Sequence, residues 1–189
     1  MKLILASSSP RRLELLASIG IVPHQILSPD IDESPLKNED VRPYVERIAL
    51  LKAQAVHRQV SDAYVLAADT AVELGGKIVL KAGNQEEARA ILTRLSGRRH
   101  RVYTGVCLIS PEGKEASRAV ITRVSFKRLS QEELTKFLDS GDWKGRAGAY
   151  SIQGECAKFV KFLSGSYSNV VGLPLYETDS LLKGLGFRG

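Results

Sequence analysis

The chain has 189 residues, of which 43% are hydrophobic and 25% are charged. This length and composition indicate a single globular domain, residues 1–189, that buries roughly 70% of its unfolded surface and is not disordered. Lysine plus arginine (27) exceed aspartate plus glutamate (21), and the net charge of +6 favours an anionic partner such as a nucleotide, a nucleic acid or a membrane surface.

The first predicted elements are a strand at residues 3–5, a run of serines and a helix. Ser9 is the expected N-cap, because Pro10 suits the first helical turn. Arg11 and Arg12 then lie at a helix end whose partial positive charge disfavours cations by roughly 0.3 to 1 kcal/mol. A bound anion would reverse this effect, whereas the alternative is that both arginines are simply solvated.

The next segments contribute a carboxylate and a lysine. Residues 29–37 form a proline-bounded loop that contains Glu33, which is either a solvated acid or part of a site. Residues 41–56 form a helix whose apolar stripe includes Lys52. Such a lysine either extends outward to solvent or reaches inward to a phosphate.

A buried strand at residues 64–68 is expected to end at Asp69 and Thr70, where open α/β sheets place ligand chemistry. A two-glycine turn at residues 75–76 then predicts a hairpin. The expected pairs across this turn are Leu74–Lys77, Val72–Val79 and Thr70–Lys81. The hairpin therefore returns Lys81 to the end of the strand that carries Asp69.

The remaining chain alternates helices and strands. The predicted elements are a helix begun by Asn84 and ended by Gly97, antiparallel strands at 102–109 and 119–126, a helix between Ser130 and Gly141, a glycine-rich loop at 141–154, a strand at 159–163 and a helix at 174–182. Cys107 and Cys156 lack metal-ligand spacing and are expected to be reduced thiols. No apolar run approaches the ~18 residues of a membrane span, so we expect a cytoplasmic protein without a membrane partner.

The residues that could carry chemistry are a set of cations beside carboxylates. The sequence has no GxxxxGK[ST] phosphate loop, and its three histidines lack metal-ligand spacing. No serine or cysteine nucleophile has a plausible histidine base. The carboxylates Glu33 and Asp69 suit a divalent cation, Mg²⁺ or Mn²⁺, and the basic groups suit polyphosphate oxygens. These residue types therefore favour phosphate chemistry.

Six collinear motifs point to a known family. They are ASSSPRR near the start, DIDE at 30–33, AADT at 67–70, LSGRRHRV at 95–102, AGAYSIQG at 147–154 and SYSNVVGLPL at 166–175. Together they resemble the Maf family of nucleoside triphosphate pyrophosphatases. The resemblance implies an α/β fold with a long mixed β-sheet flanked by helices and two lobes with a central cleft, similar to inosine triphosphate pyrophosphatases. It also implies cleavage of the α–β phosphate bond with a divalent metal, giving a nucleoside monophosphate and pyrophosphate.

The resemblance assigns roles to individual residues. Ser9, Arg11 and Arg12 match the phosphate-binding serine and arginine pair. Glu33 and Asp69 match the acidic, metal-binding pair, Asp69 being the proton acceptor.

Further positions match the family's lysines and its base-selecting residues. Lys52 and Lys81 match two phosphate-side lysines, and both are expected to neutralise charge on the pyrophosphate leaving group. Arg11, Thr70 and Gln153 match positions that discriminate bases, and Thr70 with Gln153 favours the branch handling dTTP and UTP over the branch handling 7-methyl-GTP.

Two departures and two alternatives accompany this interpretation. Ala82 follows Lys81 where the family usually has proline, and Arg146 replaces a usual lysine, keeping the charge but not the geometry.

Two alternative functions are a basic nucleic-acid-binding protein and a cell-division regulator that acts through protein contacts. The dispersed charge and the lack of a reader motif argue against a stable nucleic-acid complex. We expect a nucleoside triphosphate as the ligand, either dTTP and UTP or a modified nucleotide, with a homodimer as a possible assembly.

Overall fold

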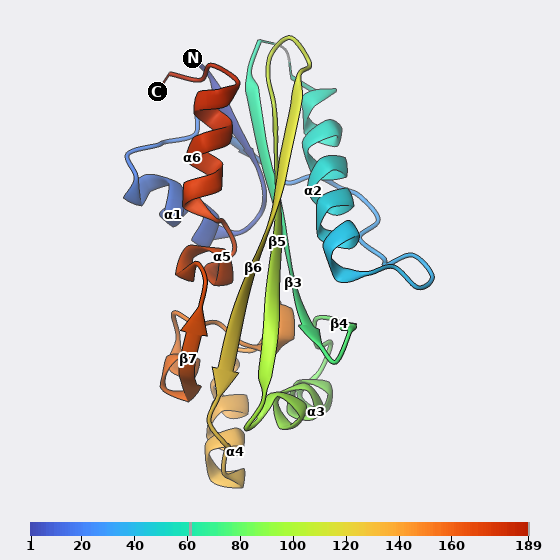
Figure 1. Ribbon diagram of the computed structural model, residues 1–189, viewed down its shortest axis with the longest axis vertical. Coiled ribbons are helices and arrows are strands. Elements are labelled where there is room, and N and C mark those ends of the chain that lie inside the picture. Colours follow the sequence, from blue (N-terminus) through green and yellow to red (C-terminus); the bar gives the residue numbers. More distant parts are fainter. Residues whose placement is uncertain (61, 189) are drawn as a thin grey trace.

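The computed structural model describes residues 1–60 and 62–188, which form a seven-stranded mixed sheet extended along the long axis of the molecule (Figure 1). The strand order is β2-β1-β3-β5-β6-β7, with β4 paired to β3. The strands are β1 (Leu3–Ala6), β2 (Gln25–Leu27), β3 (Tyr64–Leu74), β4 (Lys77–Val79), β5 (Arg99–Ile109), β6 (Glu115–Phe126) and β7 (Val160–Ser164). β1 runs parallel to β2 and β3, and the other pairs are antiparallel, which confirms the expected α/β class with a mixed sheet.

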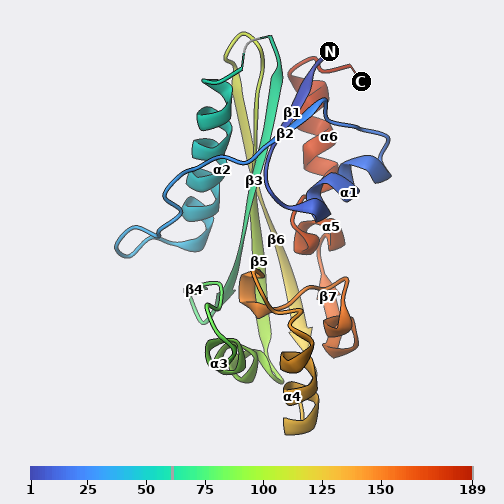
Figure 2. The ribbon, with the colours of Figure 1, turned by 180° about the vertical axis from the view of Figure 1, so that it is seen from behind.

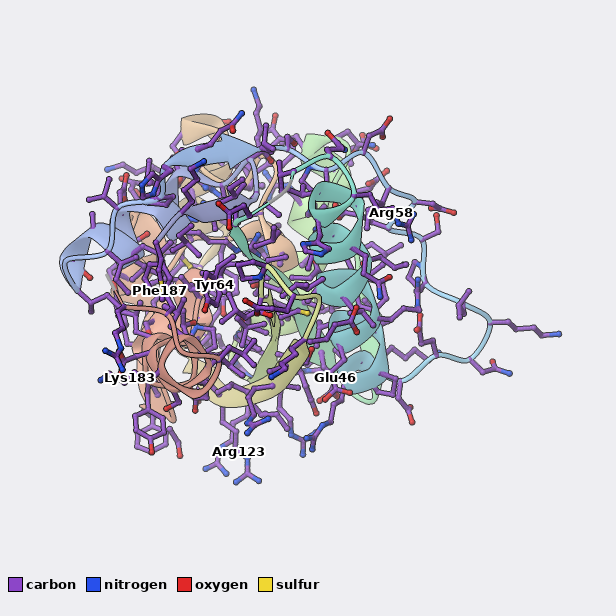
Figure 3. The ribbon with its side chains drawn as sticks, turned by 90° about the horizontal axis from the view of Figure 1, so that it is seen from above. Glu46, Arg58, Tyr64, Arg123, Lys183 and Phe187 are labelled. Carbon is purple, nitrogen blue, oxygen red and sulfur yellow. The ribbon has the colours of Figure 1, made fainter. Side chains whose placement is uncertain are left out.

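Helices cover both faces of this sheet. They are α1 (Pro10–Ser18), α2 (Val41–His57), α3 (Gln85–Leu95), α4 (Gln131–Ser140), α5 (Tyr167–Val171) and α6 (Leu175–Gly184), with 3₁₀ turns η1 (Ala147–Ala149) and η2 (Glu155–Phe159). Seen along the long axis, α2 with Glu46 and Arg58 lies on one side of the strands, and α6 with Lys183 lies on the other (Figure 3). Tyr64 packs edge-on against Phe187 and fixes the chain after α6 to the sheet.

The elements gather into two lobes joined by the long strands β3, β5 and β6. One lobe contains β1, α1, α2 and α6, and the other contains β4, α3, α4 and β7 (Figure 2). The second lobe has its own buried core, which includes Leu92, Phe126, Phe137 and Phe159. The two-lobed organisation therefore agrees with the sequence-based expectation.

The sequence identified most elements but missed some. Asn84 and Ser130 cap α3 and α4 as predicted. The short strand β2 and the short helix α5 were not predicted.

Cys107 and Cys156 are buried free thiols, as expected, and burial raises the pKa of Cys107 to about 11. Among the described residues, no helix has both the length and the apolar character that a membrane span requires.

The prediction that the central strand ends at Asp69 and Thr70 was wrong, because β3 continues to Leu74. Glycines at 75 and 76 both have positive φ, as a tight hairpin turn requires, and the predicted pairs Val72–Val79 and Leu74–Lys77 are present. The third pair, Thr70–Lys81, is absent from the described ladder because β4 ends at Val79.

The strand β3 has an unpaired edge where the two lobes meet. Its pairing with β1 ends at Ala67, and its pairing with β4 begins at Val72. Over residues 68–71 its described strand neighbour is therefore β5 alone. Side chains alternate between the faces of a strand, so Asp69 and Thr70 start on opposite faces. The interrupted edge lets both side chains reach one opening.

Helix α2 lies unusually close to β5. A Cβ atom at Gly105 would lie 2.2 Å from the carbonyl oxygen of Val45. No side chain larger than hydrogen fits there unless α2 moves away from the sheet. Gly105 therefore fixes the distance between the sheet and the helix that carries Lys52.

A buried histidine links the sheet to the segment after η1. His100 Nε2 lies 2.8 Å from the hydroxyl oxygen of Tyr150, and the edges of both rings pack against Phe126. Burial lowers the pKa of His100 to about 4, although the negative charge of Glu73 opposes this effect. His100 is therefore neutral in the folded protein at neutral pH.

We expect Gly105→Ala to lower the free energy of unfolding by about 3 kcal/mol, because the added methyl group collides with the backbone of α2. Gly184→Ala is the matched control, since a Cβ atom there meets no described atom within 4 Å. Urea denaturation measures both variants. Equal stabilities of the two variants would contradict the close approach.

We expect the stability to fall as the pH is lowered from about 6.5 to about 4. In that range the unfolded state binds a proton on residue 100 that the folded state excludes, and the full effect is on the order of 3 kcal/mol. Urea denaturation at several pH values measures it. His100→Gln should flatten the dependence, and an unchanged slope in this variant would disprove the assignment to His100.

Candidate active site

A cleft of about 270 Å³ lies where the two lobes meet. One part of its wall is charged and includes Arg11, Arg12, Glu33, Lys52, Asp69 and Lys81, and a further cation, Arg146, also lines the cleft. The other part is mainly apolar and includes Val72, Val102, Tyr150, Ile152 and Val170. The cleft can thus accept a ligand with one polyanionic end and one flat, less polar end.

Lys52 connects the two carboxylates of the cleft. Its Nζ atom lies 2.8 Å from Glu33 Oε1 and 2.8 Å from Asp69 Oδ1. Lys52 and Asp69 are buried, whereas Glu33 is partly exposed. Of the two predicted orientations of Lys52, the structure therefore has the inward one.

Lys81 completes this group of charges. Its Nζ atom lies 3.6 Å from Glu33 Oε2, although its side chain is largely exposed. Partial burial opposes the ionisation of Glu33, but the hydrogen bond and charge of Lys52, helped by Lys81, outweigh it and lower the pKa of this carboxyl group. Glu33 is therefore an anion at neutral pH.

Three separate segments of the chain hold the Arg12 side chain in place. Its Nε donates to the carbonyl oxygen of Gly172 at 2.8 Å, Nη1 to Ser7 Oγ at 2.9 Å and Nη2 to Thr70 Oγ1 at 3.3 Å. Burial lowers the pKa of Arg12, while the charges of Asp69 and Glu33 oppose this effect. A guanidinium group has five N–H donors, so some remain for a ligand.

The start of α1 supplies further donors. Ser9 occupies the N-cap position, as predicted, although its side chain makes no capping hydrogen bond to a described residue. Ser9 lines the cleft. Arg11 also lines the cleft, and its buried Nη1 atom has no hydrogen-bond partner among the described residues.

The structure does not place every predicted residue in the cleft. Thr70 is in the wall, but Gln153 is exposed and is not among the residues that line the cleft, although its neighbours Ser151 and Ile152 are. Sequence reasoning missed Gly172 as a partner of Arg12. The sequence did offer one signal for Gly172, because this residue lies in the motif at residues 166–175.

The donor set fits a magnesium-type cation better than zinc. In the described parts of the chain, no cluster of three or more His, Cys, Asp or Glu side chains is positioned to bind a metal. Mg²⁺ is usually held by one or two carboxylates, with substrate phosphates and water supplying the other ligands. Glu33 and Asp69, which both contact Lys52, can supply such a pair.

The fold and the cleft define a mixed α/β protein with a site lined by both cations and carboxylates. By sequence, the chain belongs to the family described as Maf-like protein, whose profile matches residues 2–185. The predicted family is thereby confirmed.

Two bacterial relatives match nearly the whole chain. A dTTP/UTP pyrophosphatase of Agrobacterium fabrum is 53% identical and is aligned over 99% of this chain and 93% of its own length. A dTTP/UTP pyrophosphatase of Rhodospirillum rubrum is 50% identical over 98% of this chain and 89% of its own length. Among solved structures, the Ham1 protein of Staphylococcus aureus matches 67% of this chain and 72% of its own, with 16% identity and a TM-score of 0.49.

We expect Lys52→Met to lower the free energy of unfolding by about 3 kcal/mol at pH 7, because it leaves two carboxylates without their shared cation. The double variant Lys52→Met/Asp69→Asn should be less destabilised than Lys52→Met alone, since one of those charges is gone. A double-mutant cycle by urea denaturation measures this coupling.

Lys183→Met is the matched control. Lys183 forms an exposed ion pair with Asp179, and its loss should change stability by no more than about 0.5 kcal/mol. Purely additive effects of Lys52→Met and Asp69→Asn would contradict the coupling across the cleft.

Proposed function

We propose that this protein is a nucleoside triphosphate pyrophosphatase that converts dTTP and UTP to the monophosphate and pyrophosphate. The observation that carries the proposal is the contact of Lys52 with both Glu33 and Asp69, beside Arg12 in one cleft. Relatives named dTTP/UTP pyrophosphatase that are at least 50% identical over nearly the whole chain support this choice of substrates.

The cationic groups bind the triphosphate in this proposal. Arg11, Arg12 and the hydroxyl group of Ser9 converge on phosphate oxygens from the start of α1, and guanidinium groups suit such oxygens by forked hydrogen bonding. Lys52 and Lys81 neutralise the charge that develops on the departing pyrophosphate.

Asp69 is the proposed proton acceptor. A water molecule attacks the α-phosphorus atom, its proton passes to the Asp69 carboxylate, and the bond between the α-phosphorus and the bridging oxygen breaks. Lys52, which donates to Asp69 Oδ1 at 2.8 Å, orients this carboxylate. Burial of Asp69 limits competing bulk water.

A divalent cation, Mg²⁺ or Mn²⁺, is the proposed cofactor, and Glu33 and Asp69 would hold it. When bound, it supplies Lewis-acid neutralisation of phosphate charge.

The apolar part of the cleft accepts the nucleoside in this proposal. Thr70 and Arg11 line the cleft and are proposed to take part in base selection. The role of Gln153 in base discrimination remains a prediction, which rests on the family motif.

We expect Asp69→Asn to lower turnover of dTTP and UTP by at least about 10³-fold, because the amide cannot accept the proton. A panel of dTTP, UTP, dCTP, GTP and 7-methyl-GTP, scored for monophosphate and pyrophosphate, measures activity. Asp139→Asn, which changes an exposed carboxylate on α4, is the matched control and should retain full activity.

Several outcomes would contradict the proposal. Release of orthophosphate instead of pyrophosphate would exclude cleavage at the α-phosphorus, and full activity of folded Asp69→Asn would exclude its role. A protein without turnover that binds duplex DNA with steep salt dependence would favour the nucleic-acid-binding alternative.

A further inference from the structure

Behind Arg12, a buried chain of hydrogen bonds runs from the cleft to α5. Arg12 Nη2 donates to Thr70 Oγ1, which lies 3.0 Å from Thr104 Oγ1. Thr104 Oγ1 in turn lies 3.0 Å from the carbonyl oxygen of Asn169. Thr104 and Asn169 are fully buried, so solvent does not compete with the contact between them, whereas Thr70 is half-buried at the cleft end of the chain.

The direction of each hydrogen bond follows from counting protons. A carbonyl oxygen only accepts, so Thr104 must donate its single hydroxyl proton to Asn169. Thr104 therefore accepts in its contact with Thr70, and Thr70 donates its own single proton inward. The Thr70 oxygen is then left with lone pairs, one of which accepts from Arg12.

The position of the Asn169 carbonyl group is itself fixed. The side-chain Nδ2 atom of Asn169 donates to the carbonyl oxygen of Val102 at 3.2 Å and to Thr122 Oγ1 at 2.9 Å. Its backbone N–H donates to Ser166 Oγ, which caps α5. The acceptor that holds the Thr104 proton therefore does not rotate away.

We infer that Thr104 is a positioning residue: by donating to Asn169, it makes Thr70 present only a hydrogen-bond acceptor to the cleft. This inference rests on the proposed function and extends it to the choice of nucleoside. Thr104 itself is not among the residues that line the cleft within the described chain, so its effect on a ligand is indirect.

An acceptor at Thr70 selects the part of the substrate that contacts it. Phosphate oxygens also accept, so Thr70 disfavours the polyphosphate and favours a donor on the nucleoside. Thr70 lies between Asp69 in the charged wall and Val72 in the apolar wall, where the nucleoside would meet its phosphates. The available donors of dTTP are N3–H of the base and the 3′-hydroxyl group of the sugar.

Steady-state kcat/KM values for dTTP, dCTP and 2′,3′-dideoxy-TTP test this inference. Cytosine has an acceptor at N3, and the dideoxy sugar lacks the hydroxyl donor. In Thr104→Val the Thr70 proton loses its inner acceptor and turns toward the cleft. We expect either the dTTP/dCTP ratio or the dTTP/dideoxy-TTP ratio to fall about tenfold, and the ratio that falls identifies the donor.

Thr104→Ser is the matched control, because its hydroxyl group restores the donation to Asn169 and should retain both ratios. If Thr104→Val does not fold, Thr104→Cys replaces it, since a thiol is a weak donor of similar size. Thermal unfolding of each variant shows that it is folded.

Unchanged ratios in a folded Thr104→Val or Thr104→Cys variant would overturn the inference, as would an equal loss of turnover for all three substrates. Loss of a ratio in Thr104→Ser would also overturn it, because the serine retains the proton. Wild-type protein that hydrolyses neither dTTP nor UTP would overturn the proposed function and this inference with it, whereas active wild type with unchanged variant ratios would overturn the inference alone.

Discussion

The position of Lys52 between Glu33 and Asp69 is the interaction on which the cleft depends. A buried ammonium group is costly unless its charge is compensated, and a buried carboxylate has the same requirement. Here the ammonium comes from α2, one carboxylate comes from a loop and the other from β3. The three segments must therefore keep their relative positions, and Gly105 contributes by letting α2 lie close to the sheet.

The interrupted edge of β3 explains how one cleft collects side chains from both faces of a sheet. Between the end of its pairing with β1 and the start of its pairing with β4, residues 68–71 have one described strand neighbour. Asp69 faces α2, and Thr70 faces the side of α1 and α5, where Arg12 and Gly172 meet it. The opening therefore brings the charged groups and the apolar wall together in one cleft.

Hydrogen bonds behind the cleft fix the direction in which two hydroxyl groups donate. The contacts of Thr70, Thr104 and Asn169 give each hydroxyl proton a single destination. The contact of His100 with Tyr150, which lines the cleft, similarly fixes part of the apolar wall. In a buried setting such order is strongly favoured, because an unpaired polar group has no water to replace its partner. Hydrogen bonds from behind therefore hold parts of both the polar and the apolar wall of the cleft.

The sequence by itself determined the family, most of the strands and helices, and the residue types of the cleft. Local signals were sufficient where the cause is local: Ser130 with Glu133 for a helix start, or two adjacent glycines for a hairpin. The tertiary structure decided what depends on contacts between distant segments. Periodicity placed Lys52 in an apolar stripe but left its direction open, because only the packing of α2 against β3 brings Asp69 within 2.8 Å. The extension of β3 past Asp69, the holding of Arg12 by Gly172 and the inward proton of Thr70 likewise follow from partners far away in the chain.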